Sequence, residues 1–285
     1  MLTNINLIRV LRTKTGAPIK HCQQALTNNN NDLEQSIRWL RSEGMHSART
    51  KYSKTTQEGI ITIFCSNNKA TLTELSVETD FARKNQKFIN LADNITKAAH
   101  IYNSENVQDF LINAHIKNIQ IKKIIDEHIN IIGENIVLKK IRNISINSGY
   151  LHYYIHNKIN ENSGDIITVM TIQGNIYKEV EQFAKQIAMH ITALNPLVLK
   201  TSDLHQTIIN KEKELIISQL QKEGKSSKMV EKILPGKLAK FYKDTVLMEQ
   251  ILVTDNKSLI KTLLSNMKSQ YGNAIEKFIR IAVGE

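Results

Sequence analysis

Two β-rich runs joined by a pair of asparagines constrain the fold of this chain most strongly. The runs are GIITIFCS and KATLTELSVET, and Asn67-Asn68 stands between them. Asparagine tolerates the positive φ of a tight turn, and β-branched residues favour strands, so an antiparallel hairpin is expected here. A helix should follow, because apolar residues recur at spacings of three and four. These apolar positions are Phe88, Leu91, Ile95 and Ala98.

A second set of helix and strand signals follows the first. Residues 104–129 carry the apolar spacing of a helix, Gly133 opens further β-rich runs, and residues 179–194 again have helical spacing. Two strand-plus-helix units in succession predict an α+β fold whose core consists of two related halves. The expected halves are residues 58–132 and residues 133–202.

The remaining segments are expected to be helical or extended. Residues 1–45 contain three short helical patterns, enough for a small N-terminal domain, and residues 46–57 are basic, lack acidic residues and suggest an exposed tether. Residues 203–242 have a narrow apolar stripe that favours a protruding antiparallel hairpin of two helices, which Pro235 should kink or interrupt. Residues 243–285 are expected to return to the core.

Composition and targeting signals favour a cytoplasmic protein. No apolar segment approaches the roughly 20 residues that cross a bilayer, and the start lacks the pattern of a secretory signal. Cys22 and Cys65 lie far apart, as is typical of reduced thiols. We therefore expect no membrane partner. The formal charge of +11 favours acidic partners but does not choose between nucleic acids and proteins.

Motifs of catalysis are missing from the sequence. It contains no GxxxxGK[ST], GxGxxG, HExxH or GxSxG pattern. His152 and His156 are four residues apart, but in a strand this separates them by about 13 Å, which is too far to share a metal. No basic patch is interleaved with stacking aromatics. We expect no enzymatic activity, no cofactor, no metal and no direct binding of nucleic acid.

The pair Asp80-Phe81 stands at the expected junction of a strand and a helix, and it has two interpretations. Thr79 or Asp80 could cap the helix by accepting an N–H bond, worth about 1 kcal/mol, while Phe81 packs on the sheet. Alternatively, the junction presents two side chains to another protein. Local rules alone favour the first interpretation.

A chain-long pattern changes this balance. The stretch ETDFARKNQKF is similar to a signature of the form TDFVA[RK]xxxF, with Ala82 and Arg83 replacing the usual Val and Ala. The other stretches of the pattern, in order, are LRTKTGAPIKHCQQAL, IGENIVLKKI, AKQIAMHITALNP and GKSSKMVEKILPGKLAKFYKDTVLMEQILV. Together they resemble the elongation factor Ts family, guanine-nucleotide exchange factors for the translational GTPase EF-Tu. Several blocks in the right order are far more specific than any one of them.

The resemblance implies both a fold and a function. It implies a UBA-like N-terminal domain and, because the chain stops at Glu285, a shortened C-terminal module. It also implies that Thr79, Asp80, Phe81 and Ala82 enter the G domain of GDP-bound EF-Tu, displace the region that supports Mg²⁺ and release GDP so that GTP can bind. The other contact residues that it implies are Ile132, Gly133, His156, Ile19, Lys20 and Gln23.

One alternative from another functional class stays open. The N-terminal domain, the tether and the positive charge could instead belong to a basic RNA-associated protein without catalytic activity. A steep salt dependence of RNA binding is typical of such a protein.

Overall fold

The computed structural model describes residues 5–15, 17–40, 55–66 and 68–285. The expected tether at 46–57 lies outside these ranges except for its last residues. The N-terminal helices surround a small apolar cluster that includes Leu11, Cys22 and Leu26, all fully buried. The helices are α1 (Ile5–Thr15), α2 (Ile19–Asn28) and a further helical stretch at residues 33–40.

The first sheet of the core grows from the expected hairpin. Strands β1 and β2 pair antiparallel from Glu58↔Val77 to Ser66↔Lys69, and the sheet has the order β5-β2-β1-β7. Strand β5 falls in the range assigned to the second half, yet it pairs with β2 of the first half. The strands are β1 (Glu58–Ser66), β2 (Lys69–Val77), β5 (Ile136–Ser145) and β7 (Ser163–Gly164).

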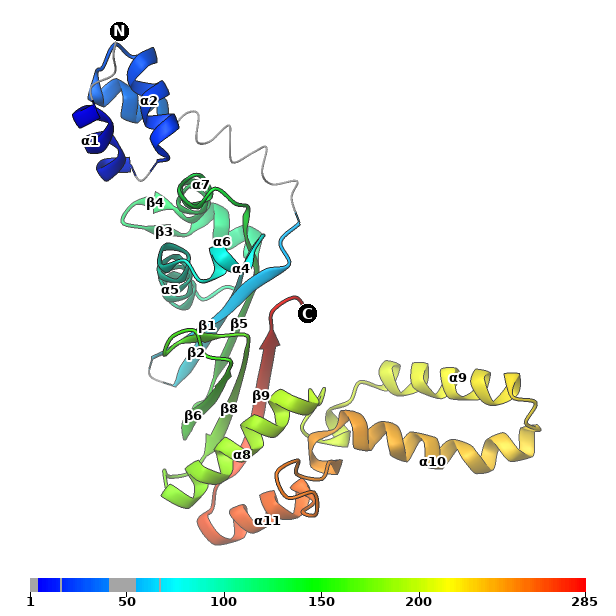
Figure 1. Cartoon of the computed structure of the whole chain (residues 1–285). Helices are drawn as coiled ribbons and strands as arrows, with labels where there is room; N and C mark the ends of the chain where they lie inside the picture. The colour runs from blue at the N-terminus through cyan, green and yellow to red at the C-terminus, as the bar shows by residue number, and fades with distance from the viewer. Residues whose placement is uncertain (1–4, 16, 41–54, 67) are drawn as a thin grey trace.

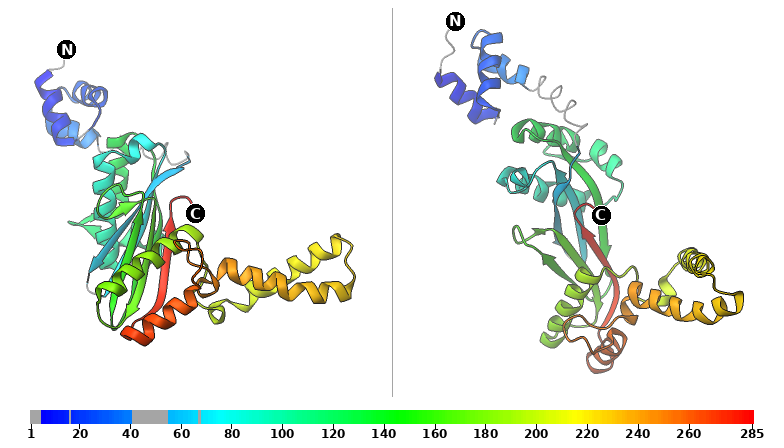
Figure 2. Two further views of the ribbon diagram at one scale, coloured as in Figure 1. Left: turned by 60° about the horizontal axis from the view of Figure 1, so that its bottom comes forward. Right: turned by 45° about the vertical axis from the view of Figure 1, so that its right-hand side comes forward.

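A second antiparallel sheet packs on the first. Its order is β6-β8-β9, so the final strand of the chain pairs with β8. Side chains of both sheets form one apolar cluster, in which Ile61 and Leu72 of the first sheet meet Ile167 and Val169 of the second. Figure 2 shows the strands of the two sheets running through the centre of the molecule. The strands are β6 (Tyr150–His156), β8 (Ile166–Gln173) and β9 (Ala274–Ala282).

Helices complete the apolar clusters on the outer faces of the sheets. Phe88 and Ile95 of α5 pack with β2 and β5, and Ile187 of α8 packs with β8. The helix expected at 104–129 is interrupted by a two-stranded turn in which Lys117 and Asn118 have positive φ. Helical spacing on either side of a turn does not reveal the turn itself. The elements are α4 (Asp80–Arg83), α5 (Gln86–Tyr102), α6 (Val107–Asn113), β3 (His115–Ile116), β4 (Ile119–Gln120), α7 (Ile121–Ile132), α8 (Lys178–Leu194) and α11 (Ile260–Tyr271).

A pair of antiparallel helices projects from the core between α8 and α11 (Figure 1). Helices α9 (Gln206–Lys222) and α10 (Ser227–Thr245) enclose a small cluster of Ile216, Leu220 and Val230. Short 3-10 turns, η1 (Thr201–Asp203) and η2 (Leu247–Glu249), flank the pair. Of the two effects expected of Pro235, an interruption is wrong, because α10 runs through it as one helix, and a kink stays a prediction.

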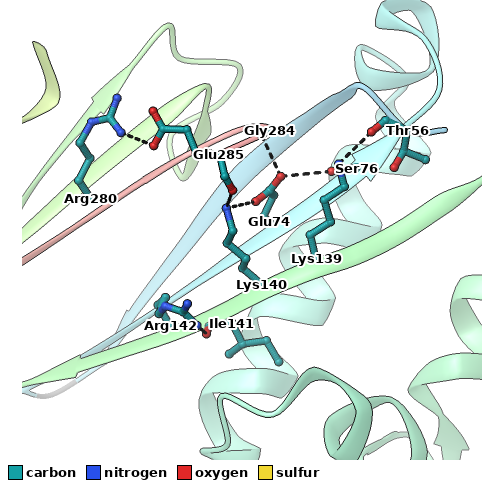
Figure 3. Close-up of polar contacts among 10 residues, drawn as sticks. All are labelled: Thr56, Glu74, Ser76, Lys139, Lys140, Ile141, Arg142, Arg280, Gly284 and Glu285. Carbon is teal, nitrogen blue, oxygen red and sulfur yellow. Dashed lines mark hydrogen bonds and ion pairs between the residues drawn. The ribbon is translucent and has the colours of Figure 1, made fainter. Parts of the chain in front are cut away.

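The last residues of the chain lie against a buried carboxylate (Figure 3). Glu74 of β2 is fully buried, its carboxylate lies 3.0 Å from Nζ of Lys140, and its Oε1 accepts the amide of Gly284 at 3.0 Å. Lys140 also donates to the carbonyl of Glu285. These contacts join β9 of the second sheet to β2 and β5 of the first.

The mixed α+β class expected from the sequence is confirmed, with helices at the N-terminus and antiparallel sheets behind them. In the part of the chain that the structure describes, no helix is both long enough and apolar enough to traverse a membrane. The precise domain boundaries stay predictions.

Candidate functional site

The short helix α4 presents an aromatic side chain to solvent. Phe81 is 84% exposed, although it stands next to Ala82, which is 5% exposed and packs in the core. The buried aromatic is Phe88, at the start of α5, with no exposure. A single exposed apolar side chain is not unusual in itself, and Ile101 of α5 is 83% exposed as well. Phe81 is distinguished by its position next to Asp80 in the short helix α4.

The N-terminus of α4 is capped by Thr79. Its hydroxyl accepts the amide of Ala82 at 3.3 Å, which satisfies one of the free N–H groups of the first turn. The first local interpretation was therefore correct for the cap and wrong for the aromatic. Asp80 is half-exposed and forms an ion pair of 3.2 Å with Lys84, so its carboxylate lies at the surface beside Phe81.

Thr79 is also bound to the end of α7. Its hydroxyl and its backbone amide donate to the two carboxylate oxygens of Glu134, at 2.6 and 2.9 Å. Glu134 directly follows Gly133, which caps α7 in a left-handed conformation with φ +92°. A side chain is strained in that conformation, so glycine is favoured. Gly133 is exposed and Ile132 is half-buried. The bonds between Thr79 and Glu134 bring this end of α7 to the start of α4.

The C-terminus of α4 is bound to the second sheet. Arg83 forms an ion pair with Asp165, which precedes β8, and a longer one of 3.7 Å with Glu58 of β1. The backbone amide of Asp165 donates to the carbonyl of His156 at 3.0 Å. His156, half-buried, lies at the end of β6, where its Nδ1 is 3.5 Å from the hydroxyl of Tyr154. Glu134 thus connects the predicted residues 79–82 with residues 132–133. The Arg83–Asp165 pair connects them with residue 156, because the amide of Asp165 is bonded to His156.

Comparison with known proteins assigns the chain to a family. A family model described as elongation factor TS matches residues 78–285. The elongation factor Ts of Ehrlichia ruminantium is 37% identical over 96% of both chains. That of Orientia tsutsugamushi is 33% identical over 97% of this chain and 89% of its own. That of Brucella anthropi is 30% identical over 100% of this chain and 94% of its own.

The chain belongs to the elongation factor Ts family. It is a nucleotide exchange factor for EF-Tu in translation elongation, and it is not an enzyme. The family implies EF-Tu as its partner. This membership favours the exchange-factor interpretation over the alternative of a basic RNA-associated protein.

The N-terminal contact residues expected of an elongation factor Ts lie on one exposed helix face. Ile19, Lys20 and Gln23 are exposed on α2, and Ile19 is 53% exposed. Pro18, the N-cap of this helix, and His21 line a cleft of about 850 Å³ whose opposite wall is α7 with the β3–β4 turn.

Histidines and acidic residues do not assemble into a metal site in the described ranges, where no three such side chains converge. Burial lowers the pKa of His152, which favours its neutral form. His152 and His156 both lie on strand β6, as the sequence pattern predicts.

Sequence reasoning missed Glu134, Arg83 and Asp165, which hold α4 in place. Glu134 belongs to the stretch IGENIVLKKI, whose similarity to the family does not indicate a side-chain role. In the sequence, Arg83 stands out only as a departure from the usual Ala. The available signal was charge, because one unusual basic residue behind the Asp-Phe pair needs acidic partners if it is to be buried.

Proposed function

We propose that this protein binds GDP-bound EF-Tu directly and inserts Asp80 and Phe81 between helices of the G domain. The insertion displaces the region of EF-Tu that supports Mg²⁺, so GDP is released and GTP can bind. The observation that carries the proposal is the 84% exposure of Phe81 on a helix bound at both of its ends. In a GTPase, Mg²⁺ and the phosphate-binding loop both bind the nucleotide, so disturbing that region weakens the binding of GDP.

The energetics suit a rigid aromatic side chain. If this protein lowers the affinity of EF-Tu for GDP by some factor, GDP must lower the affinity of EF-Tu for this protein by the same factor. Each tenfold of this coupling corresponds to about 1.4 kcal/mol. Burying a phenylalanine side chain is worth about 1.5–3 kcal/mol. A pocket for Phe81 that exists only in the open form of EF-Tu would therefore supply roughly ten- to hundredfold of coupling.

Further contacts support the same binding mode. Gly133 and Ile132, next to Thr79, would approach the phosphate-binding loop, and the strand end at His156 would contact the third domain of EF-Tu. The exposed face of α2 would rest on the G domain. The residues of that face are Ile19, Lys20 and Gln23.

The protein is proposed to act in the cytoplasm, where translation elongation takes place. EF-Tu, in its GDP-bound and nucleotide-free forms, is its proposed partner. No nucleic acid, membrane or cofactor is needed for this action, because the nucleotide and its Mg²⁺ belong to EF-Tu.

Release of a fluorescent GDP analogue from EF-Tu tests this proposal. The wild type should accelerate release, and the double variant Asp80→Ala, Phe81→Ala should lose at least about tenfold of the acceleration. Ile101→Ala is the matched control, because Ile101 is 83% exposed on α5. It removes a similar exposed apolar group without touching α4, so release should stay at the wild-type rate.

Two outcomes would contradict the proposal. A wild-type protein that leaves GDP release unchanged would refute direct exchange. A double variant as active as the wild type would refute the role of Asp80 and Phe81. RNA binding whose affinity falls steeply with salt, together with no effect on GDP release, would instead support the RNA-associated alternative.

A further inference from the structure

Arg83 connects the helix that carries Phe81 to the other sheet of the core. Its guanidinium pairs with Asp165, 82 positions later in the chain, and its second terminal nitrogen lies 3.7 Å from Glu58. The side chain is 19% exposed, and that of Asp165 is 29% exposed. Ion pairs shielded from water to this degree are screened less by salt than surface pairs. The planar guanidinium can bind two carboxylates at once, which an ammonium cannot do with the same geometry.

Asp165 is itself held at three points. Its Oδ2 accepts the side-chain amide of Asn157 at 2.9 Å. Its backbone amide donates to His156 at 3.0 Å, and its carbonyl accepts the amide of Val283 at 3.1 Å. The carboxylate that receives Arg83 is therefore fixed where β6, β8 and β9 meet.

Helix α4 cannot hold its own position. It spans only Asp80–Arg83, and a single helical turn is unstable in isolation. Three contacts locate it: the Thr79 bonds to Glu134, the burial of Ala82, and the Arg83 pair. Of these three contacts, the Arg83–Asp165 pair is the one that joins α4 to the end of β6, where His156 lies. Phe81 contributes little to this anchoring because it is 84% exposed.

We infer that Arg83 is a positioning residue for nucleotide exchange, holding Phe81 at a set distance and angle from the strand end at His156 through Asp165. This inference rests on the proposed function, in which both points engage EF-Tu together. Two contacts on one rigid body bind at a lower entropic cost than two contacts that move independently. Without the pair, Phe81 would still be present, but it would sample positions that do not fit the pocket.

The test compares Arg83→Gln, Phe81→Ala and the double variant in single-turnover release of fluorescent GDP from EF-Tu. Each is measured over a range of concentrations, so that the maximal release rate and the half-saturating concentration are separated. Arg83→Gln should lower the maximal rate by roughly three- to thirtyfold, which lies within the range of interaction energies between coupled residues. In the Phe81→Ala background, the same change should have little further effect, because Arg83 acts through Phe81.

Two further variants separate positioning from stability. Arg83→Lys keeps the charge and should lie between wild type and Arg83→Gln, and Asp165→Asn should reproduce the effect of Arg83→Gln. Arg142→Gln, which breaks a separate pair with Glu105, is the matched control and should leave exchange unchanged. Thermal unfolding of every variant shows whether it is folded at the assay temperature.

The outcomes distinguish the inference from the proposal beneath it. If Phe81→Ala reduces exchange and Arg83→Gln does not, Arg83 is not a positioning residue. If the two losses simply add, Arg83 acts on stability alone, and the inference is overturned as well. If Phe81→Ala itself has no effect, the proposed function is at fault, and the inference falls with it.

Discussion

Thr79 and Glu134 form a two-bond contact across 55 positions of sequence, with the hydroxyl of Thr79 at 2.6 Å and its amide at 2.9 Å from the two carboxylate oxygens. The contact fastens the N-cap of α4 to the residue that follows the C-cap of α7. Hydrogen bonds to a charged acceptor are the stronger kind. The helix that carries the exposed Phe81 is therefore held at its N-terminus by strong hydrogen bonds.

Replacing Thr79 by valine keeps the shape of the side chain but removes its hydroxyl. The cap of α4 and one bond to Glu134 are lost, so the free energy of unfolding should fall by about 1–2 kcal/mol and GDP release from EF-Tu should slow. Asn106→Ala is the matched control, because Asn106 caps α6 through the amide of Asp109. It should lose about 1 kcal/mol without slowing release. Equal slowing by both variants would mean that only stability matters.

The two phenylalanines near α4 should differ in how much they contribute to the free energy of unfolding. Phe81→Ala should change the free energy of unfolding by less than about 0.5 kcal/mol, since the side chain is 84% exposed. Phe88→Ala should cost about 3–5 kcal/mol, because it leaves a cavity in the core. Urea denaturation measures both. A large loss of stability in Phe81→Ala would show that this ring is part of the core.

Stability should decrease on acidification through His190. Burial lowers the pKa of this histidine below its ordinary value of 6.5, and the bond to Gln250 offsets part of that effect. The amide of Val253 donates to its Nδ1 at 3.2 Å, so Nε2 carries the proton and donates to Gln250 at 2.8 Å. The folded state thus favours the neutral ring, while below pH 6.5 the unfolded state gains a proton.

The stabilising contribution of His190 is therefore complete above pH 6.5 and is lost as the pH falls. It changes by at most about 1.4 kcal/mol per pH unit. Denaturation between pH 7.5 and 5 should show that the free energy of unfolding falls less steeply with falling pH in His190→Gln than in wild type. Burial also lowers the pKa of His100 and His152, so part of the slope should remain. An unchanged slope would show that His190 is not linked to folding.

The buried carboxylate of Glu74 depends on Lys140 (Figure 3). Lys140→Met should cost about 3 kcal/mol, because it leaves a fully buried charge without its counter-ion. Adding Glu74→Gln should recover part of the loss, since the charge is then removed. A double variant less stable than Lys140→Met would show that Glu74 is stabilised mainly by the amide of Gly284.

Sequence periodicity predicted the elements that local rules control. The hairpin around Asn68 and the helix that buries Phe88 follow from alternation and from spacings of three and four. The same rules failed at residues 104–129, where a turn at Lys117-Asn118 divides two helices. At Pro235 they wrongly allowed an interruption, where α10 packs against α9 as one helix. In both cases the local sequence pattern does not determine whether the helix continues.

The sequence by itself determined the mixed α+β class, the position of α4 between a strand and a longer helix, and the resemblance that singled out Asp80 and Phe81. Only the tertiary structure decided that Phe81 faces solvent while Phe88 is buried. It also decided that Glu134 and Asp165 hold the two ends of α4. Those carboxylates lie 55 and 82 positions from their partners, and no local periodicity encodes such a distance. The pairing of strands from both halves of the chain brings them together.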